Sequence, residues 1–318
     1  GEVAPGQAVR IFTGAPVPAG ADAIVIQENT AVDGGHVIVN EGSPEAGHVR
    51  TRGFDFKAGD RLIDAPRRLT SRDVTLAAAA GYDRLAVHRR PKVALLATGD
   101  ELVLPGETVG PDQIVCSNPY GIAAIVRRAG GEPYFLGIAR DDRDDLRAKC
   151  EAARTADILV TIGGASVGDH DLVGPVLGDM GLDLAFWKIA MRPGKPLMFG
   201  RLDDLHVLGV PGNPVSSLIC ARIFLVPLID ALLGLPRNAQ ESASAALSSP
   251  LPAKGPRQHY MRAVRSVRPN GAVHVAPVRS QDSSLLAPLA EADCLIVRPP
   301  DDPPRAAGDP VAIIALDF

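Results

Sequence analysis

The stretch KVALLATGDE, from Lys92 to Glu101, decides the fold of this chain. Its first part, KVALLAT, is a continuous apolar run, the pattern of a strand that is buried on both faces of a parallel sheet. Its second part, Gly99-Asp100-Glu101, leaves the strand through a glycine and carries two acids. In α/β proteins with parallel sheets, ligands gather at the carboxyl ends of the strands, so this stretch predicts both a fold class and a site.

Strand-like and helix-like segments continue to alternate around this stretch. The alternation predicts an α/β protein with a central doubly wound, mostly parallel sheet over residues 91–236. A long apolar helix at 216–233 is expected to be bent or distorted by Pro227. The other expected strands are 133–139, 158–162, 184–190 and 206–210, and the other expected helices are 119–129, 143–153 and 172–180.

The remaining sequence predicts three flanking domains. Residues 1–52 are rich in Gly, Pro and Val and read as a β-rich domain, truncated at its N-terminus, with short strands such as 23–27 and 36–39. Residues 53–90 read as a mainly helical connecting and dimerisation domain, with a helix capped by Thr70 or Ser71 that ends at Gly81. Residues 237–318 predict a C-terminal β-barrel-like domain with strands at 272–278, 294–299 and 311–316.

The composition excludes several classes of protein. Thirty-three Lys and Arg residues against 37 Asp and Glu give a net charge of −4, and only 4% of residues are aromatic, so neither a basic field nor a base-stacking surface points to nucleic acid. The sequence predicts no membrane span, because no apolar run approaches about 18 residues. The four cysteines are scattered without a CxxC pair, which predicts reduced thiols in a cytoplasmic protein.

Acidic and glycine-rich segments follow the expected strands. Asp141 and Asp142 follow the strand at 133–139, although a helix cap alone would explain one of them. The segment GGASVGDHD, residues 163–171, could present backbone N–H groups to a phosphate, or form only a tight turn. The residues of that segment which we select as candidates for substrate binding are Gly163, Gly164, Ser166 and Gly168.

Basic and N–H-rich segments follow the other expected strands. The loop MRPGKP, residues 191–196, is rigid and offers Arg192 and Lys195, close in sequence to Lys188. The turn PGNP, residues 211–214, leads directly into a helix, although both segments could also be plain connections. Lysines and helix N-termini bind anions, and acids in the same pocket make sense if Mg²⁺ bridges them to phosphate oxygens. We therefore predict a Mg²⁺ site among the acids of this pocket.

Five motifs in this order resemble the MoeA family, the molybdopterin molybdenumtransferases that include the E domain of gephyrin. They are TGAPVPAGADAIV (13–25), ATGDEL (97–102), GGASVGDHD (163–171), PGKP (193–196) and PGNPVSS (211–217). The resemblance implies a central sheet domain of the molybdopterin-binding type. It implies that adenylylated molybdopterin and molybdate are converted to molybdenum cofactor with release of AMP. It also implies a divalent cation, a homodimer, and partners in the adenylyltransferase and the molybdoenzyme-maturation proteins.

The resemblance also implies site residues, position by position. Lys188, Arg192 and Lys195 would hold molybdate and phosphate, and Asp141, Asp171 and Glu101 would position the cation and the attacking water or oxyanion. Arg257 and Ser283 match an arginine and a serine that the family associates with molybdate. The residues that match functional positions are Thr13, Asp55, Glu101, Asp141, Asp171, Lys188, Lys195, Pro211, Gly212, Asn213, Pro214, Arg257 and Ser283.

The chain departs from the family's pattern at three places. Arg192 stands where the family usually has lysine, and Asp282 stands before Ser283 where the family often has glycine. The family's N-terminal segment with its MDGYA-like aspartate, which helps to build the dimer and completes the neighbour's site, is not among these residues. Two alternatives stay open: a related molybdopterin adenylyltransferase, and a non-catalytic scaffold of the same family.

Overall fold

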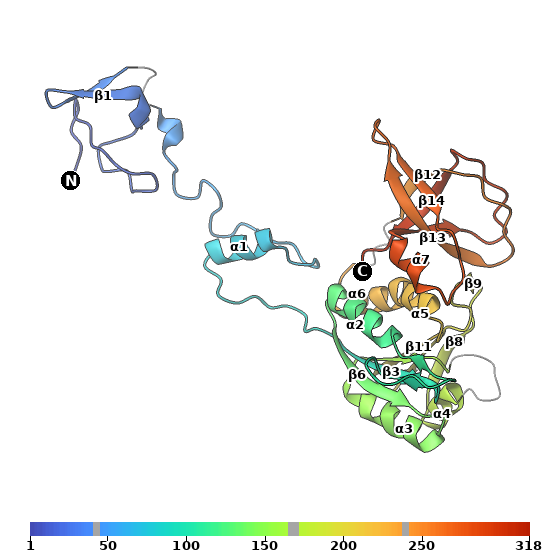
Figure 1. Cartoon of the computed structure of the whole chain (residues 1–318). Helices are drawn as coiled ribbons and strands as arrows, with labels where there is room; N and C mark the ends of the chain where they lie inside the picture. The colour runs from blue at the N-terminus through green and yellow to red at the C-terminus, as the bar shows by residue number, and fades with distance from the viewer. Residues whose placement is uncertain (41–44, 165–171, 237–241) are drawn as a thin grey trace. The chain divides into compact units, whose positions relative to one another are not determined.

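The computed structural model of the chain describes residues 1–40, 45–164, 172–236 and 242–318 (Figure 1). Contacts divide the chain into two compact units. The first unit is formed by Gly1–Ala65 and Leu69–Asp83, and the second by Pro66–Arg68 and Arg84–Phe318. The candidate site lies mainly in the second unit.

The first unit has little regular structure. Its hairpin joins β1 (Thr30–Asp33) to β2 (His36–Val39), which confirms the predicted strand at 36–39. The predicted strand at 23–27 is wrong, because only Ile24 makes a β-bridge, to Glu45. The chain turns into a 3₁₀ helix directly afterwards, which ends the extended conformation. The two 3₁₀ helices of this unit are Gln27–Asn29 and Ala46–His48.

The helix of the first unit, α1 (Ser71–Ala79), begins at the predicted cap. The Thr70 hydroxyl accepts a hydrogen bond from the Asp73 amide at 3.4 Å, and the Asp73 carboxylate accepts one from the Thr70 amide at 2.7 Å. Such a reciprocal pair satisfies two N–H groups that a helix start leaves open. Gly81, with a φ of 90°, follows the end of the helix, as predicted.

The second unit contains the predicted doubly wound sheet. Its order is β6-β3-β7-β11-β10-β8; the first four strands run parallel, and β10 and β8 complete the sheet in antiparallel pairing. The prediction missed β10, and β8 is shorter than predicted, because Lys188 takes a left-handed φ of 64° and ends the strand. The strands are β3 (Lys92–Thr98), β6 (Glu132–Ala139), β7 (Ile158–Ile162), β8 (Asp183–Trp187), β10 (Met198–Leu202) and β11 (Leu205–Val210).

Both faces of this sheet are covered, which explains the continuous apolar run in β3. Val93 and Leu95 pack on the side of α2 and the long helix, whereas Ala94 and Leu96 pack on the side of α3 and α4. All four side chains are fully buried. Figure 1 shows these helices on opposite sides of the sheet. They are α2 (Asn118–Ala129), α3 (Arg143–Ala152), with a 3₁₀ turn at Ala153–Thr155, and α4 (Val173–Asp179).

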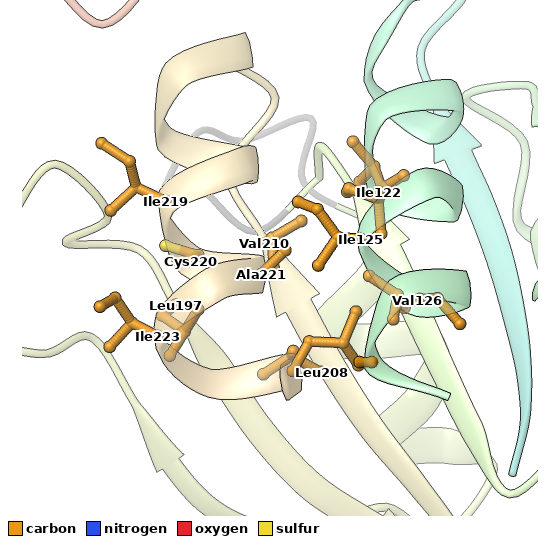
Figure 2. Close-up of a cluster of buried hydrophobic side chains, with 14 of the residues drawn as sticks. Ile122, Ile125, Val126, Leu197, Leu208, Val210, Ile219, Cys220, Ala221 and Ile223 are labelled. Carbon is orange, nitrogen blue, oxygen red and sulfur yellow. The ribbon is translucent and has the colours of Figure 1, made fainter. Parts of the chain in front are cut away.

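The long helix is distorted before Pro227, as predicted. It consists of α5 (Pro214–Cys220), a π-helical turn (Ala221–Leu225) and α6 (Val226–Leu232). A proline cannot donate the usual helix hydrogen bond, and the wider π spacing absorbs that loss. By length and composition this is the one described helix that could cross a membrane. Its side chains instead meet those of α2 above β11 in the core of the sheet domain (Figure 2).

The C-terminal part of the second unit is a closed β-barrel, which confirms the predicted class. Its strands pair in the order β14-β12-β16-β15-β13, and β13 pairs with β14 to close the ring. The prediction missed β12 and β13, whose alanines, serines and charged residues hide the strand pattern. The elements are β12 (Ser242–Leu247), β13 (Gln258–Val267), β14 (Val273–Pro277), α7 (Leu286–Glu291), β15 (Cys294–Arg298) and β16 (Pro310–Ala315).

A short strand joins the sheet domain to the barrel. β9 (Met191–Arg192) pairs in parallel with the start of β13, where Met191 lies opposite Gln258 and Arg192 opposite His259. The Gln258 amide also donates a 2.9 Å hydrogen bond to the Ala190 carbonyl. The MRPGKP loop is therefore held against the barrel by backbone hydrogen bonds.

Candidate functional site

The carboxyl ends of the parallel strands meet at one edge of the sheet. The Gly99 amide, after β3, donates to the Ala139 carbonyl at the end of β6 at 3.1 Å. The Gly163 amide, after β7, donates to the Val210 carbonyl at the end of β11 at 3.0 Å. We call this region the strand-end edge; its described residues are 99–101, 140–142, 163–164 and 211–213.

Acids occupy the β3 and β6 side of the strand-end edge. Asp142 caps α3, since its carboxylate accepts hydrogen bonds from two amides of the first turn. The Asp141 amide donates to Asp100 Oδ1 at 3.2 Å, and among the described residues no hydrogen bond engages the Asp141 carboxylate. The Glu101 carboxylate lies over Gly99, where a Cβ would come within 2.2 Å of Oε2. The two neighbouring acids therefore differ: the Asp142 carboxylate caps a helix, whereas the Asp141 carboxylate has no hydrogen-bond partner among the described residues.

A buried thiol lies close to this acidic side. The Cys116 amide donates to the Val103 carbonyl at 2.8 Å, beyond the short parallel pair β4 (Leu102–Val103) and β5 (Ile114–Val115). Burial, assisted by the charge of Glu101, raises the pKa of Cys116 to about 11. The thiol therefore stays protonated at neutral pH. The sequence analysis did not single out this residue, because only the fold brings it near Glu101.

The glycines after β7 allow close packing of backbones. Gly163 has a φ of 92°, and a Cβ there would lie 3.0 Å from the Thr98 carbonyl oxygen. Gly164 has a φ of 60°, and a Cβ there would lie 2.4 Å from Val173 Cγ2. A side chain at either position would be both strained and crowded. The three other candidates from this segment, Ser166, Gly168 and Asp171, lie outside the described residues.

The PGNP turn is held from three directions. Asn118 Nδ2, in α2, donates to the Gly212 carbonyl at 2.6 Å. The Ser217 hydroxyl, in α5, donates to the Pro211 carbonyl. From the C-terminal domain, Ser283 Oγ accepts a hydrogen bond from Asn213 Nδ2 at 3.1 Å. Sequence analysis missed Asn118, which belongs to no recognisable motif, and did not select Ser217, although the motif PGNPVSS contains it.

The loop after β8 displays cations. The Lys188 amide donates to the Leu197 carbonyl at 2.9 Å, and the Ile189 amide donates to the Lys195 carbonyl at 3.0 Å, so the two ends of the loop are tied together. Lys188 Nζ lies 4.2 Å from the centre of the Trp187 ring. Neither lysine makes an ion pair within the described ranges, so both charges are available to an anion.

Further cations gather where β9 meets the barrel. His259 of β13 pairs with Arg192 on one side and with Arg298 of β15 on the other. Burial, followed by the charges of Lys254, Arg192, Arg298 and Arg257, lowers the pKa of His259 to about 3, so its imidazole is neutral. The structure thus brings Arg257 toward Arg192, whereas Ser283 lies at Asn213. We call this group the basic cluster; it consists of Arg192, Lys254, Arg257, His259 and Arg298.

Two predicted residues, Thr13 and Asp55, lie in the first unit. Thr13 is exposed in a turn closed by a 2.9 Å hydrogen bond from the Ala15 amide to the Phe12 carbonyl. Asp55 is exposed and lines a pocket with Phe54, which is covered by the Arg50 guanidinium at 4.9 Å. The functional roles of both residues stay predictions.

A separate groove of about 680 Å³ lies between α2 and α6. Its charged walls are paired, with Arg68 3.2 Å from Asp230 and Arg222 3.2 Å from Asp317. It contains none of the residues predicted to be functional. The strand-end edge and the basic cluster are therefore the stronger candidates for chemistry.

Three family regions cover most of the chain. Residues 1–81 match the "MoeA N-terminal region (domain I and II)", residues 94–231 the "Probable molybdopterin binding domain", and residues 244–316 the "MoeA C-terminal region (domain IV)". All three occur in the order in which the structure places the first unit, the sheet domain and the barrel.

Curated relatives and a solved structure agree with these matches. The molybdopterin molybdenumtransferase of Haemophilus influenzae is 33% identical over 309 residues, which cover 96% of this chain and 76% of the relative. The enzyme of the same name from a Nostoc strain is 38% identical over 238 residues, 74% of this chain and 55% of the relative. The MoeA protein of Pyrococcus horikosii superposes with a TM-score of 0.78 at 27% identity, covering 100% of this chain and 78% of that one.

We expect Gly163→Ala to destabilise the second unit by about 1–3 kcal/mol, because a Cβ would meet the Thr98 carbonyl in a left-handed backbone conformation. Gly212→Ala is the matched control: its φ lies outside the left-handed range and a Cβ there has no neighbour closer than 3.6 Å. Chemical denaturation of both variants measures the difference. Equal losses of stability would contradict this account of the strand ends.

A pH titration of stability tests the neutral state of His259. The pKa of His259 is about 3 in the fold and ordinarily near 6.5. Between these two pH values His259 takes up a proton in the unfolded chain but not in the folded chain. Stability contributed by the neutral imidazole is therefore lost as pH falls from about 7 toward 4, by at most about 1.4 kcal/mol per pH unit. His259→Gln should flatten this part of the profile. A profile that the substitution leaves unchanged would mean that His259 is already charged in the fold.

Proposed function

The chain belongs to the MoeA family, and on that premise we propose that it inserts molybdate into adenylylated molybdopterin with release of AMP, a step of molybdenum cofactor biosynthesis. The observation that carries the proposal is the meeting of three kinds of group in one unit. Acids follow β3 and β6, closely packed glycines and a helix start follow β7 and β11, and cations follow β8. Both substrates are anions that need such a combination of groups.

The cations account for substrate binding. Lys188 and Lys195, without ion pairs among the described residues, would neutralise phosphate oxygens of the AMP-linked pterin. Arg192 and Arg257 would hold molybdate at the basic cluster. Arg192 replaces the family's usual lysine and keeps the charge, but its planar guanidinium offers a fork of donors where an ammonium offers a point charge.

The acids fit a divalent cation shared with the substrate. No group of three Asp, Glu, His or Cys side chains that could hold a metal occurs in the part of the chain that the structure describes. Mg²⁺ is commonly held by one or two carboxylates together with substrate phosphates and water, and Glu101 and Asp141 offer such oxygen donors. When bound there, Mg²⁺ would neutralise charge at the phosphate linkage. Asp171, the third candidate ligand, stays a prediction.

We propose that the protein's side chains catalyse the reaction by orienting the reacting groups and by stabilising the charge that develops on the phosphate. The Asp141 carboxylate would orient the water or oxyanion that attacks the adenylate. Lys188 and Lys195 would stabilise the negative charge that develops on the phosphate oxygens as the bond to AMP breaks. Asn213, bonded to Ser283, would hold the PGNP turn and its helix start in place beside the substrate.

The family resemblance extends the proposal beyond the chemistry. We infer that the protein is a homodimer and acts in the cytoplasm. Its substrate would come from the adenylyltransferase, and its product would pass to molybdoenzyme-maturation proteins. No described feature favours the adenylyltransferase or the scaffold alternative. The matches to N-terminal and C-terminal MoeA regions support the insertion reaction instead.

The proposal predicts that Asp141→Asn lowers molybdate-dependent AMP release by about a hundredfold or more, since a charge aimed at the reacting centre is lost. The measurement is AMP formed from adenylylated molybdopterin with and without molybdate. Asp144→Asn, an exposed neighbour in the first turn of α3, is the matched control and should react like the wild type. Normal turnover by a folded Asp141→Asn variant would contradict the assignment.

A further inference from the structure

The basic cluster carries more positive charge than the carboxylates bonded to it neutralise. Arg192, Lys254 and Arg257 have no ion pair within the described ranges. Among the described residues, the carboxylate bonded into the cluster is that of Asp302, which is already shared between Arg298 and Arg305. Several other cations of the second unit are paired; Lys149, for example, lies 3.1 Å from Asp145. Three cations without an ion pair among the described residues therefore lie close together at this junction.

Backbone pairing fixes the position of these groups. Arg192, His259 and Arg298 form one row across β9, β13 and β15, and side chains of register partners share a face of the sheet. Lys254 reaches this row from the segment before β13. Its amide donates to the Asp302 carbonyl at 2.9 Å, and the Asp301 amide donates to the Gly255 carbonyl at 3.0 Å. Lys254 and its neighbour Gly255 are thus each held by one backbone hydrogen bond, which keeps this segment beside the row.

Two buried polar atoms of the row point independently to a ligand. His259 is 3% exposed and Arg298 is 1% exposed. Within the described residues, His259 Nδ1 and Arg298 Nη1 have no hydrogen-bond partner. A buried polar group without a partner is destabilising, so such a pair calls for a water molecule or a ligand atom. Next to three unpaired cations, an oxygen of an anion satisfies this requirement best.

We propose that Lys254 is a further oxyanion-binding residue, which together with Arg192 and Arg257 surrounds a tetrahedral dianion above the buried row of His259 and Arg298. The inference rests on the proposed function, because molybdate is an anion of this class. The neutral imidazole of His259 adds no charge, so the dianion meets the cations alone. Burial and the positive charges of Arg192, Arg298 and Arg257 lower the pKa of Lys254. A bound dianion would offset the repulsion between these cations.

The experiment is calorimetric titration of the whole protein with sodium molybdate alone. Lys254→Met should raise the dissociation constant for molybdate by about tenfold or more, the usual effect of losing one charge-assisted hydrogen bond. Lys254→Arg keeps the charge and should retain most of the affinity. Lys149→Met removes a paired lysine from α3 and should bind like the wild type. Lys254→Gln provides a second neutral variant if Lys254→Met does not fold.

The outcomes separate this inference from the proposed function. If the neutral Lys254 variants bind molybdate like the wild type while Arg257→Ala loses affinity, Lys254 is no ligand and the proposed function stands. If Lys149→Met weakens binding as much as Lys254→Met does, only the overall charge matters and the inference fails. If the wild type binds no molybdate, both the inference and the oxyanion site of the proposed function fail.

Discussion

The rest of the second unit depends on the burial of β3 and its neighbours on both faces. A strand whose successive side chains are all apolar leaves no face for water, so helices must cover the sheet on both sides. Crossover helices make the strands parallel, and parallel strands end at one edge. The hydrogen bonds from Gly99 to Ala139 and from Gly163 to Val210 are the direct result of that order. The polar loops after these strands therefore lie together at the strand-end edge, where the candidate site is found.

A second constraint joins this edge to the barrel. Lys188 ends β8 in a left-handed conformation, and the chain then pairs through β9 with the first residues of β13. This pairing brings Arg192 of the sheet domain into one row with His259 and Arg298 of the barrel. The result is a separation of charge: acids follow β3 and β6, whereas cations follow β8 and surround the junction. Such an arrangement suits substrates that carry phosphate and a metal oxyanion.

The sequence predicted what depends on local pattern. Apolar runs identified β3, β7 and β11, and the cap at Thr70 fixed the start of α1. Strands of mixed polarity such as β13 were missed, because their burial follows from closure of the barrel. The strand at 23–27 was wrongly predicted, since an apolar run with a single bridge partner does not form a sheet.

The site followed the same rule. Motif residues such as Asp141 and Lys195 could be selected from the chain alone, and their roles stay predictions. Asn118, Lys254 and His259 could not: the contacts of Asn118 span 94 and 99 residues, and Lys254 and His259 matter through contacts that join β13 and the segment before it to distant parts of the chain. Asp142, beside Asp141, turned out to be a helix cap, a distinction that only the fold makes.

The central claim is that the oxyanion enters at the junction of the MRPGKP loop and the barrel. Its most direct test is a crystal structure of the protein soaked with molybdate, with diffraction recorded across the molybdenum absorption edge. We predict an anomalous peak within hydrogen-bonding distance of Arg192 and Arg257. A well-occupied peak elsewhere, with none at this junction, would contradict the account.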